Sequence, residues 1–157
     1  MELFSKTELG AVIKDVKKLN MEQIFRRVME QKTMQEFVFE IIRIEQLFER
    51  GIDAQGRSLG EYSPYSIEIK RSKGQRYDHI TLKDTGAFYE SFIMYIYKNY
   101  FEIDADPIKK DTNGEETNLF DEYGIDILGI TQENFEKVRQ RIKDEYNREI
   151  RRVLFGY

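Results

Sequence analysis

The feature of this sequence that most limits its fold is a long apolar stripe in the first third of the chain. Apolar side chains recur there at spacings of three and four residues, the repeat of one helix face: Met34, Phe37, Ile41, Ile44 and Phe48. Gly51 follows the stripe and is a typical helix stop. Shorter stripes precede it: Leu9, Val12, Ile13 and Val16, then Ile24, Phe25 and Val28. Because such a face must be buried, we expect helices packed on the rest of the domain or on a neighbouring subunit.

Two capping-box patterns predict where these helices begin. Ser5 with Glu8, and Thr33 with Glu36, have the spacing at which a hydroxyl and a carboxylate each accept a hydrogen bond from the other residue's amide. The apolar stripe fails just before Thr33. This predicts either two helices with a joint near residue 32 or one long helix with a kink.

The end of the chain predicts another long helix. Thr131 is a typical N-cap, and apolar residues line one side of the segment that follows it: Phe135, Val138, Ile142, Tyr146, Ile150 and Val153. Charges of alternating sign cover the rest. If Phe135 belongs to the core, its replacement by Ala should cost about 3–5 kcal/mol. If it belongs only to an interface, the variant should be a stable monomer that fails to assemble.

Turn residues and short apolar runs mark the middle of the chain as a small sheet with loops. Residues 51–64 have turn chemistry, and the alternation at Ile67 and Ile69 leads into a basic stretch in which we expect little regular structure between 70 and 80. Aromatic alternation on both sides of Lys98 and Asn99 predicts two antiparallel strands joined there.

A polar connection over residues 105–118, with an Asn113-Gly114 turn, is expected to follow this hairpin. Leu119, Phe120 and Tyr123 then predict a short helix that ends at Gly124.

These elements predict an α+β fold with N-terminal helices, a small antiparallel sheet with a hairpin, and a long C-terminal helix. The chain has 157 residues, of which 40% are hydrophobic and 13% aromatic, which suits one domain with its own core. We expect a single domain over 1–157, made of a helical part (1–50), a loop and small-sheet part (51–130) and the C-terminal helix (131–157).

Composition excludes much of catalysis and metal binding. The chain has no Cys and one His, so it offers no thiol nucleophile, and His79 has no second His at metal-ligating spacing. The acidic loop around Asp111 fails as a calcium loop, because the first and twelfth ligand positions would be Lys109 and Phe120. No phosphate-binding loop or nucleophile elbow is present. We therefore expect no enzyme activity, catalytic residue, metal or cofactor.

Charge and hydropathy bear on the partners of the chain. No segment approaches the ~20 apolar residues of a membrane helix, and the charged start is unlike a signal peptide, so we expect a cytoplasmic origin and no membrane contact. The net charge of −4 disfavours a dedicated nucleic-acid binder. A basic stretch lies near Tyr65 and Tyr77, formed by Lys70, Arg71, Lys73 and Arg76. Neighbouring acids favour a solvated face or a salt-bridged subunit contact over DNA binding there.

Three strings in the middle of the chain carry a family resemblance. They are GRSLGEYSPYSIEIKRSKG (56–74), LKDTGAFYESF (82–92) and LFDEYGIDILGIT (119–131), with the aromatic hairpin between the second and third. In this order, followed by a charged C-terminal helix, they resemble the tail-completion, or virion-morphogenesis, proteins of tailed phages. The resemblance covers about residues 50 to 155.

The matching residues fall into four short elements. The first consists of Gly56, Leu59, Tyr62, Ser63, Pro64 and Lys70. The second consists of Leu82, Thr85, Gly86, Phe88 and Ser91. The third, which lacks the family's histidine, consists of Phe120, Glu122, Tyr123 and Gly124. The fourth, which lacks the family's arginine, consists of Ile127, Leu128, Gly129 and Ile130. With Phe135 and Ile142 of the last helix, these elements supply the residues we assign to the scaffold and to subunit contacts.

The resemblance implies a structural protein of the phage neck, or head–tail connector. Such a chain would be assembled in the host cytoplasm, would join the portal or an adaptor protein to tail proteins, and would let genomic DNA pass without specific binding. It would form a homo-oligomeric ring, twelve-fold on the portal or six-fold on a tail tube. A ring needs two different complementary surfaces on each subunit. The charged face of the C-terminal helix and the long N-terminal stripe are the two candidates.

Two other functions stay open at this point. The chain could be a small adaptor or assembly factor that binds a protein partner through its N-terminal helices. It could also handle nucleic acid through the basic stretch at 70–76, which salt-dependent DNA binding would reveal.

The turn after Asp84 and Thr85 generates a prediction about Gly86. The chain must turn tightly there before the strand, a conformation with positive φ that a β-branched residue adopts only at a cost of about 1–3 kcal/mol. Gly86→Val should therefore lower the melting temperature. An unchanged melting temperature and unchanged assembly would show that the turn is wrongly assigned.

Overall fold

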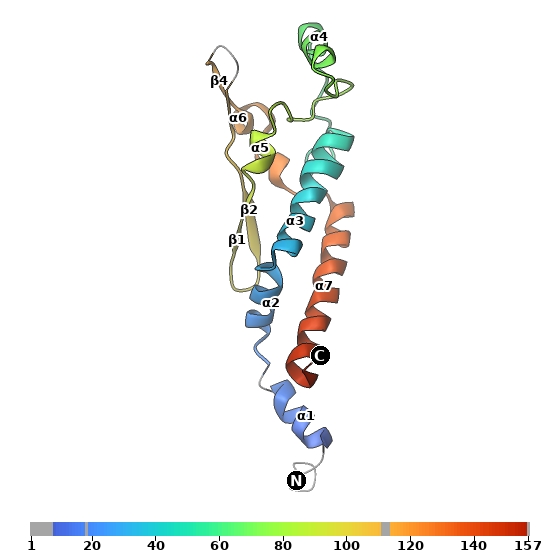
Figure 1. Ribbon diagram of the computed structural model, residues 1–157, viewed down its shortest axis with the longest axis vertical. Coiled ribbons are helices and arrows are strands. Elements are labelled where there is room, and N and C mark those ends of the chain that lie inside the picture. The colour runs from blue at the N-terminus through green and yellow to red at the C-terminus, as the bar shows by residue number, and fades with distance from the viewer. Residues whose placement is uncertain (1–7, 18, 111–113, 157) are drawn as a thin grey trace.

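The computed structural model describes residues 8–17, 19–110 and 114–156. It has the predicted α+β fold, arranged as an elongated body of two helical columns with a β ribbon along one side (Figure 1). One column contains the N-terminal helices and the other is the C-terminal helix. The predicted cap at Ser5 and the turn residue Asn113 lie outside the described residues.

The first column is built from four helical segments: α1 (Glu8–Lys17), α2 (Met21–Met29), α3 (Lys32–Glu40) and the π-helix η2 (Ile41–Arg50). Asn20 caps α2 and accepts hydrogen bonds from the amides of Glu22 and Gln23. The helix is interrupted between α2 and α3, which confirms the prediction of two helices with a joint near residue 32. The predicted capping box at Thr33 is wrong, because α3 already begins at Lys32 and its N-cap residue is Gln31.

The π-helix changes which residues of the predicted stripe are buried. In a π-helix the backbone hydrogen bonds join residues five apart, so each turn contains more residues than a turn of an α-helix. Residues spaced three and four apart therefore do not stay on one face. Ile42, Gln46 and Leu47 are fully buried, whereas Ile44, which the stripe predicts to be buried, is 40% exposed. The helix ends at Gly51 in the left-handed conformation, as expected.

The second column is α7 (Gln132–Phe155), which runs alongside α2 and α3 (Figure 1). Thr131 caps it as predicted, accepting a hydrogen bond from the amide of Asn134. Val138 is fully buried, but Phe135 is 46% exposed because the first turn of α7 directs Asn134, rather than Phe135, toward the core. Of the two roles considered for Phe135, burial in the core is therefore excluded, and a role at the surface remains.

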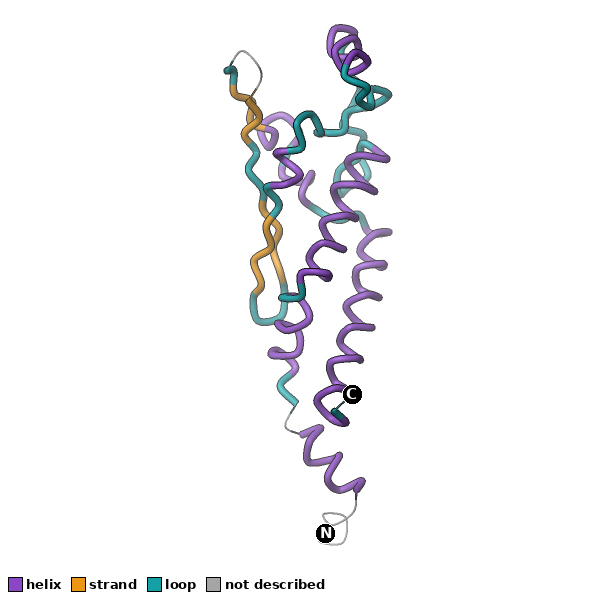
Figure 2. Tube along the Cα trace, in the orientation of Figure 1, coloured by secondary structure: helices purple, strands orange, loops and turns teal. Residues whose placement is uncertain are grey.

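The named strands of the described residues form two separate hairpins (Figure 2). Strands β1 (Ile93–Ile96) and β2 (Phe101–Asp104) are antiparallel, with Ile96 opposite Phe101, which confirms the turn at residues 98 and 99. A second hairpin, β3 (Ile108–Lys110) with β4 (Glu116–Asn118), occupies the predicted polar connection. Each strand of this hairpin has three residues, and none is buried, so no apolar alternation reveals it in the sequence.

The segment between Gly51 and β1 contains helices where the alternation of Ile67 and Ile69 suggested a strand. Helix α4 (Pro64–Ser72) begins at Ser63, whose hydroxyl accepts a hydrogen bond from the amide of Ser66, and Pro64 occupies the favoured first position. The first part of the basic stretch at 70–76, where we expected little regular structure, is thus the end of this helix. The α4 helix projects from the end of the body, and we call it the arm (Figure 1).

Three short helices complete the fold: α5 (Ala87–Glu90), α6 (Leu119–Tyr123) and the 3-10 helix η3 (Ile125–Leu128). Gly86 precedes α5 with a φ of +97°, which confirms the tight turn predicted at this position. Helix α6 ends at Gly124, also as predicted.

The core lies between the two columns and extends beneath the β1–β2 ribbon. Buried side chains of α2, α3 and η2 meet α7 there, and Phe92 packs edge-on against Phe39 and Phe88 at ring-centroid distances of 5.8 and 5.4 Å. Most of the N-terminal stripe is therefore buried within the subunit, and Ile44 is its exposed member. This leaves the stripe less apolar surface for a ring contact than its length suggests. No described helix combines the length and the apolar character needed to cross a bilayer.

Burial predicts different costs for two truncations. Ile42→Ala removes a fully buried side chain and should lower the free energy of unfolding by about 2–5 kcal/mol. Phe135→Ala removes a half-exposed ring and should cost only about 1 kcal/mol. Urea unfolding of both variants measures this difference. Equal losses of stability would contradict the finding that the first turn of α7 directs Asn134, rather than Phe135, toward the core.

Candidate functional site

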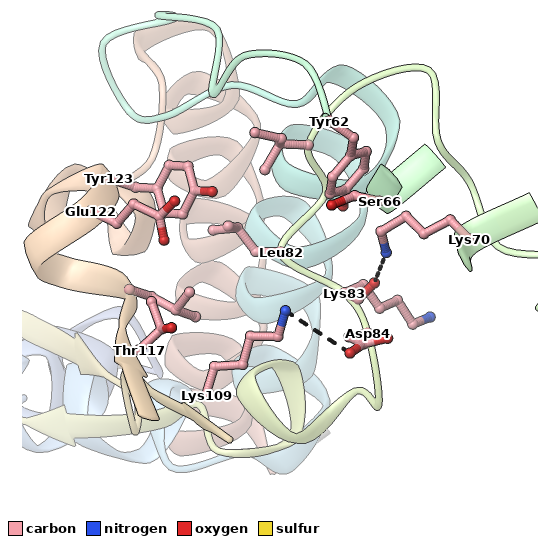
Figure 3. A pocket seen from close by; sticks show the side chains of 12 residues that line it. Tyr62, Ser66, Lys70, Leu82, Lys83, Asp84, Lys109, Thr117, Glu122 and Tyr123 are labelled. Carbon is pink, nitrogen blue, oxygen red and sulfur yellow. Dashed lines mark hydrogen bonds and ion pairs between the residues drawn. The ribbon is translucent and has the colours of Figure 1, made fainter. Parts of the chain in front are cut away.

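The candidate site is a cleft at the base of the arm (Figure 3). Three adjoining hollows of about 210, 290 and 440 Å³ share lining residues and together form this cleft. Its walls come from α4 with Tyr62, from residues 80–88, and from the β3–β4 hairpin with the α6 helix that follows it. We call the three hollows the first, second and third, in order of increasing volume.

Tyr62 joins the arm to the wall of the cleft. Its hydroxyl lies 3.2 Å from the Thr81 hydroxyl and accepts a hydrogen bond from the Thr81 amide at 3.0 Å. The Lys70 ammonium lies 4.6 Å from the centre of the Tyr62 ring and donates to the carbonyl of Lys83 at 3.1 Å. Lys70 is only 8% exposed, and a further contact with the side-chain oxygen of Gln75 at 3.4 Å helps to hold its ammonium group inside the cleft.

Tyr123 lines the first hollow from α6, beside Glu122 (Figure 3). Burial, together with the Glu122 carboxylate, raises the pKa of Tyr123. Burial likewise raises the pKa of Tyr89, which lies behind the wall of the cleft. Both phenols therefore stay protonated at neutral pH, and the Tyr89 hydroxyl donates a hydrogen bond to the Thr81 carbonyl.

Asp84 is the acidic group at the centre of the cleft. Lys73 lies 3.5 Å and Lys109 3.9 Å from its carboxylate oxygens. Burial alone would raise the pKa of Asp84, but the attraction of Lys109, Lys73 and Lys70 outweighs it and lowers the pKa. The carboxylate is therefore ionised at neutral pH and holds the surrounding lysines near one another.

Leu82, on the floor of the cleft, has a φ of +55° and is the one non-glycine residue with positive φ among those described. An aliphatic side chain pays about 1–3 kcal/mol for this conformation. The neighbouring contacts of Tyr62, Lys70 and Tyr89 with residues 81 and 83 hold the backbone there. The wall of the cleft is thus a strained segment fixed from both sides.

The cleft brings together six of the residues that the sequence predicted as scaffold or contact residues. Tyr62, Leu82 and Tyr123 line the first hollow, and Leu82, Thr85, Gly86 and Phe88 line the second. These residues come from three of the four elements of the resemblance.

The other predicted residues lie outside the cleft. Three of them are partly buried against the core: Leu59, Phe120 and Ile142. Leu128 is buried, and Phe135 is exposed on α7. Gly56 and Gly124 lie in turns. A Cβ at Gly129 would lie 2.5 Å from the Cβ of Ala54, so glycine there permits close contact between two loops.

Sequence reasoning missed a buried polar cluster centred on Gln46. The Gln46 amide donates to the carbonyl of Gly129 at 3.0 Å, and its oxygen accepts from the Thr131 amide at 2.9 Å and the Asn134 side chain at 3.2 Å. Its backbone carbonyl accepts from the amide of Ile52. The sequence did contain one sign of this cluster, namely an amide side chain within an apolar stripe. Such a side chain requires hydrogen-bond partners if it is buried.

A second group of polar contacts ties the loop after Gly51 to η3. Arg57 donates to the carboxylates of Asp53 at 2.7 Å and Asp126 at 2.6 Å. Burial would raise the pKa of Asp53, but hydrogen bonds from Arg57 and from the Gln55 amide lower it overall. The Ala54 amide also donates to the Asp126 carbonyl at 3.0 Å, so the loop that leads to the arm is attached to the body at two places.

The basic residues predicted between 70 and 76 are largely engaged within the subunit. Arg76 pairs with Asp78 and Glu49, and Arg71 lies 4.7 Å from the Tyr77 ring centre. The ion pairs of Arg76 reduce the positive charge available to a phosphate backbone on this side of the arm.

No group of three or more metal-ligating side chains is close enough to hold a metal within residues 8–17, 19–110 and 114–156. Comparison of the chain with protein-family models, with curated proteins and with solved structures finds no match.

The Gln46 cluster generates a prediction about stability. Gln46→Leu keeps the volume of the side chain but leaves the Thr131 amide, the Gly129 carbonyl and the Asn134 side chain without their partner, and each unsatisfied buried group costs about 1–3 kcal/mol. We expect at least about 2 kcal/mol of lost stability in urea unfolding. Gln140→Leu, on the exposed face of α7, is the matched control and should be nearly neutral. A neutral Gln46→Leu would contradict the role of this cluster.

Proposed function

We propose that this chain is a structural subunit of a tailed-phage neck, where it joins the DNA-filled head to the tail. One observation carries the proposal: residues from three separate elements of the family resemblance line one cleft, from whose edge the arm projects. Hydrogen bonds, ion pairs and aromatic contacts hold these residues in place. Such an arrangement suits the docking of a neighbouring chain better than it suits turnover of a substrate.

The elongated body offers distinct surfaces at its end and along its side, which a closed ring requires. The outer face of α7 is charged and includes the half-exposed Phe135, so it remains a candidate for one ring contact. The cleft and the arm, at the end of the body, are the candidates for contact with the portal, an adaptor protein or a tail protein.

The net charge of −4 supports the proposal that DNA passes the ring without binding, because an acidic channel wall repels phosphate. The ion pairs of Arg76 with Glu49 and Asp78 point in the same direction. A cluster of lysines and arginines lining the channel in the assembled ring would contradict this part of the proposal.

Quantitative mass spectrometry of purified virus particles tests the proposed function. The copy number of this chain relative to the portal protein should be near one for a twelve-fold ring, or near one half for a six-fold ring. Capsid protein from the same particles provides the internal standard. Absence of the chain from the particles would overturn the structural proposal, and a stable one-to-one complex with another protein would identify an adaptor.

A further inference from the structure

The third hollow has a charge opposite to that of the whole chain. Four lysines and one aspartate line it, which gives an excess of three positive charges, on a chain whose net charge is −4. Glu116 pairs with Lys110 at 2.8 Å and reduces the excess to two if it is counted. A local inversion of sign within an otherwise acidic protein favours an acidic partner at this place.

The lysines of the third hollow retain capacity for another carboxylate. Lys73 and Lys109 share the single Asp84 carboxylate at 3.5 and 3.9 Å, which is longer than the ~2.7–2.9 Å of a direct charge-assisted hydrogen bond. The side chains of both lysines are nearly half exposed. Their ammonium groups can therefore contact an incoming anion without losing Asp84.

The second hollow, beside these lysines, is lined mainly by apolar side chains, and Asp84, Lys109 and Lys110 also border it. It measures about 290 Å³, and its lining includes Leu82, Phe88, Ile108 and Leu119. Ile108 is 39% exposed at its rim, and Lys109 lines both this hollow and the third. A ligand that crosses Lys109 would thus place an apolar group in one hollow and anionic groups in the other.

We infer that the cleft binds a carboxylate-rich segment of another protein, which inserts one large apolar side chain into the second hollow. The apolar hollow favours a polypeptide over a phosphate backbone, because a duplex carries no apolar side chain to fill it. Asp84, at the centre of the cleft, also opposes a continuous run of phosphates. This inference rests on the proposed function in one respect, namely that the chain acts by binding other proteins.

The probe for this inference is a fluorescein-labelled peptide with one Phe between two runs of alternating Glu and Asp. Fluorescence anisotropy with the full chain should show saturable binding at about 50 mM salt that weakens at about 300 mM salt, where exposed charges are screened. Replacing the Phe of the peptide by Ala should weaken binding further. A 20-base-pair DNA duplex is measured in parallel.

Variants of the chain assign the binding to the cleft. Lys109→Gln with Lys110→Gln removes two charges and should weaken peptide binding about tenfold. Ile108→Thr keeps a β-branched residue in the strand but removes apolar surface, and should also weaken binding. The matched control is Lys14→Gln with Lys143→Gln, which removes two exposed lysines of α1 and α7 and should leave binding unchanged. Thermal melts establish that every variant is folded.

Three results would overturn the inference: no saturable peptide binding up to about 1 mM, binding that Lys109→Gln with Lys110→Gln leaves unchanged, or tighter binding of the DNA duplex at the same lysines. Failure here is distinguishable from failure of the proposed function. A chain found in virus particles at connector stoichiometry that does not bind the peptide would contradict only the inference. A chain that binds the peptide but is absent from particles would contradict only the proposed function.

Discussion

The arrangement of this molecule depends on the buried amide of Gln46. An amide without water must have partners for both its donor and its acceptor, and here those partners are the Gly129 carbonyl, the Thr131 amide and the Asn134 side chain. The three partners lie between the end of η3 and the first turn of α7, and Gln46 is in η2. This cluster therefore holds the beginning of α7 against η2, while the apolar core joins the rest of the two columns.

The position of the cleft follows from this junction. The column ends at Gly51, the next loop is attached to η3 through Arg57, and the arm and the strained segment at Leu82 follow. Tyr62 and Lys70 then hold the arm against residues 81 and 83. Each step extends a rigid contact from the core toward the end of the body. The cleft is thus a preformed surface, which lowers the entropic cost of binding a partner.

Local chemistry made part of this structure predictable. The cap at Thr131, the joint near residue 32 and the turn at Lys98 and Asn99 each depend on neighbouring residues, and the structure confirms them. The exposure of Ile44 was not predictable from an α-helical repeat, because η2 winds as a π-helix. The grouping of cleft residues depends on contacts across the chain. Glycine and aromatic motifs indicated which residues matter, but not that Lys70 would be buried among them.

The measurement that tests the central claim most directly is zero-length carbodiimide cross-linking of assembled particles, read by mass spectrometry. The reagent joins lysines to carboxylates that are in direct contact. Our account predicts cross-links from Lys73, Lys109 or Lys110 to aspartates or glutamates of a different protein. If these lysines couple only to Asp84 and Glu116 of their own chain, while links to other proteins come from elsewhere on the body, the cleft is not the docking surface and the account is contradicted.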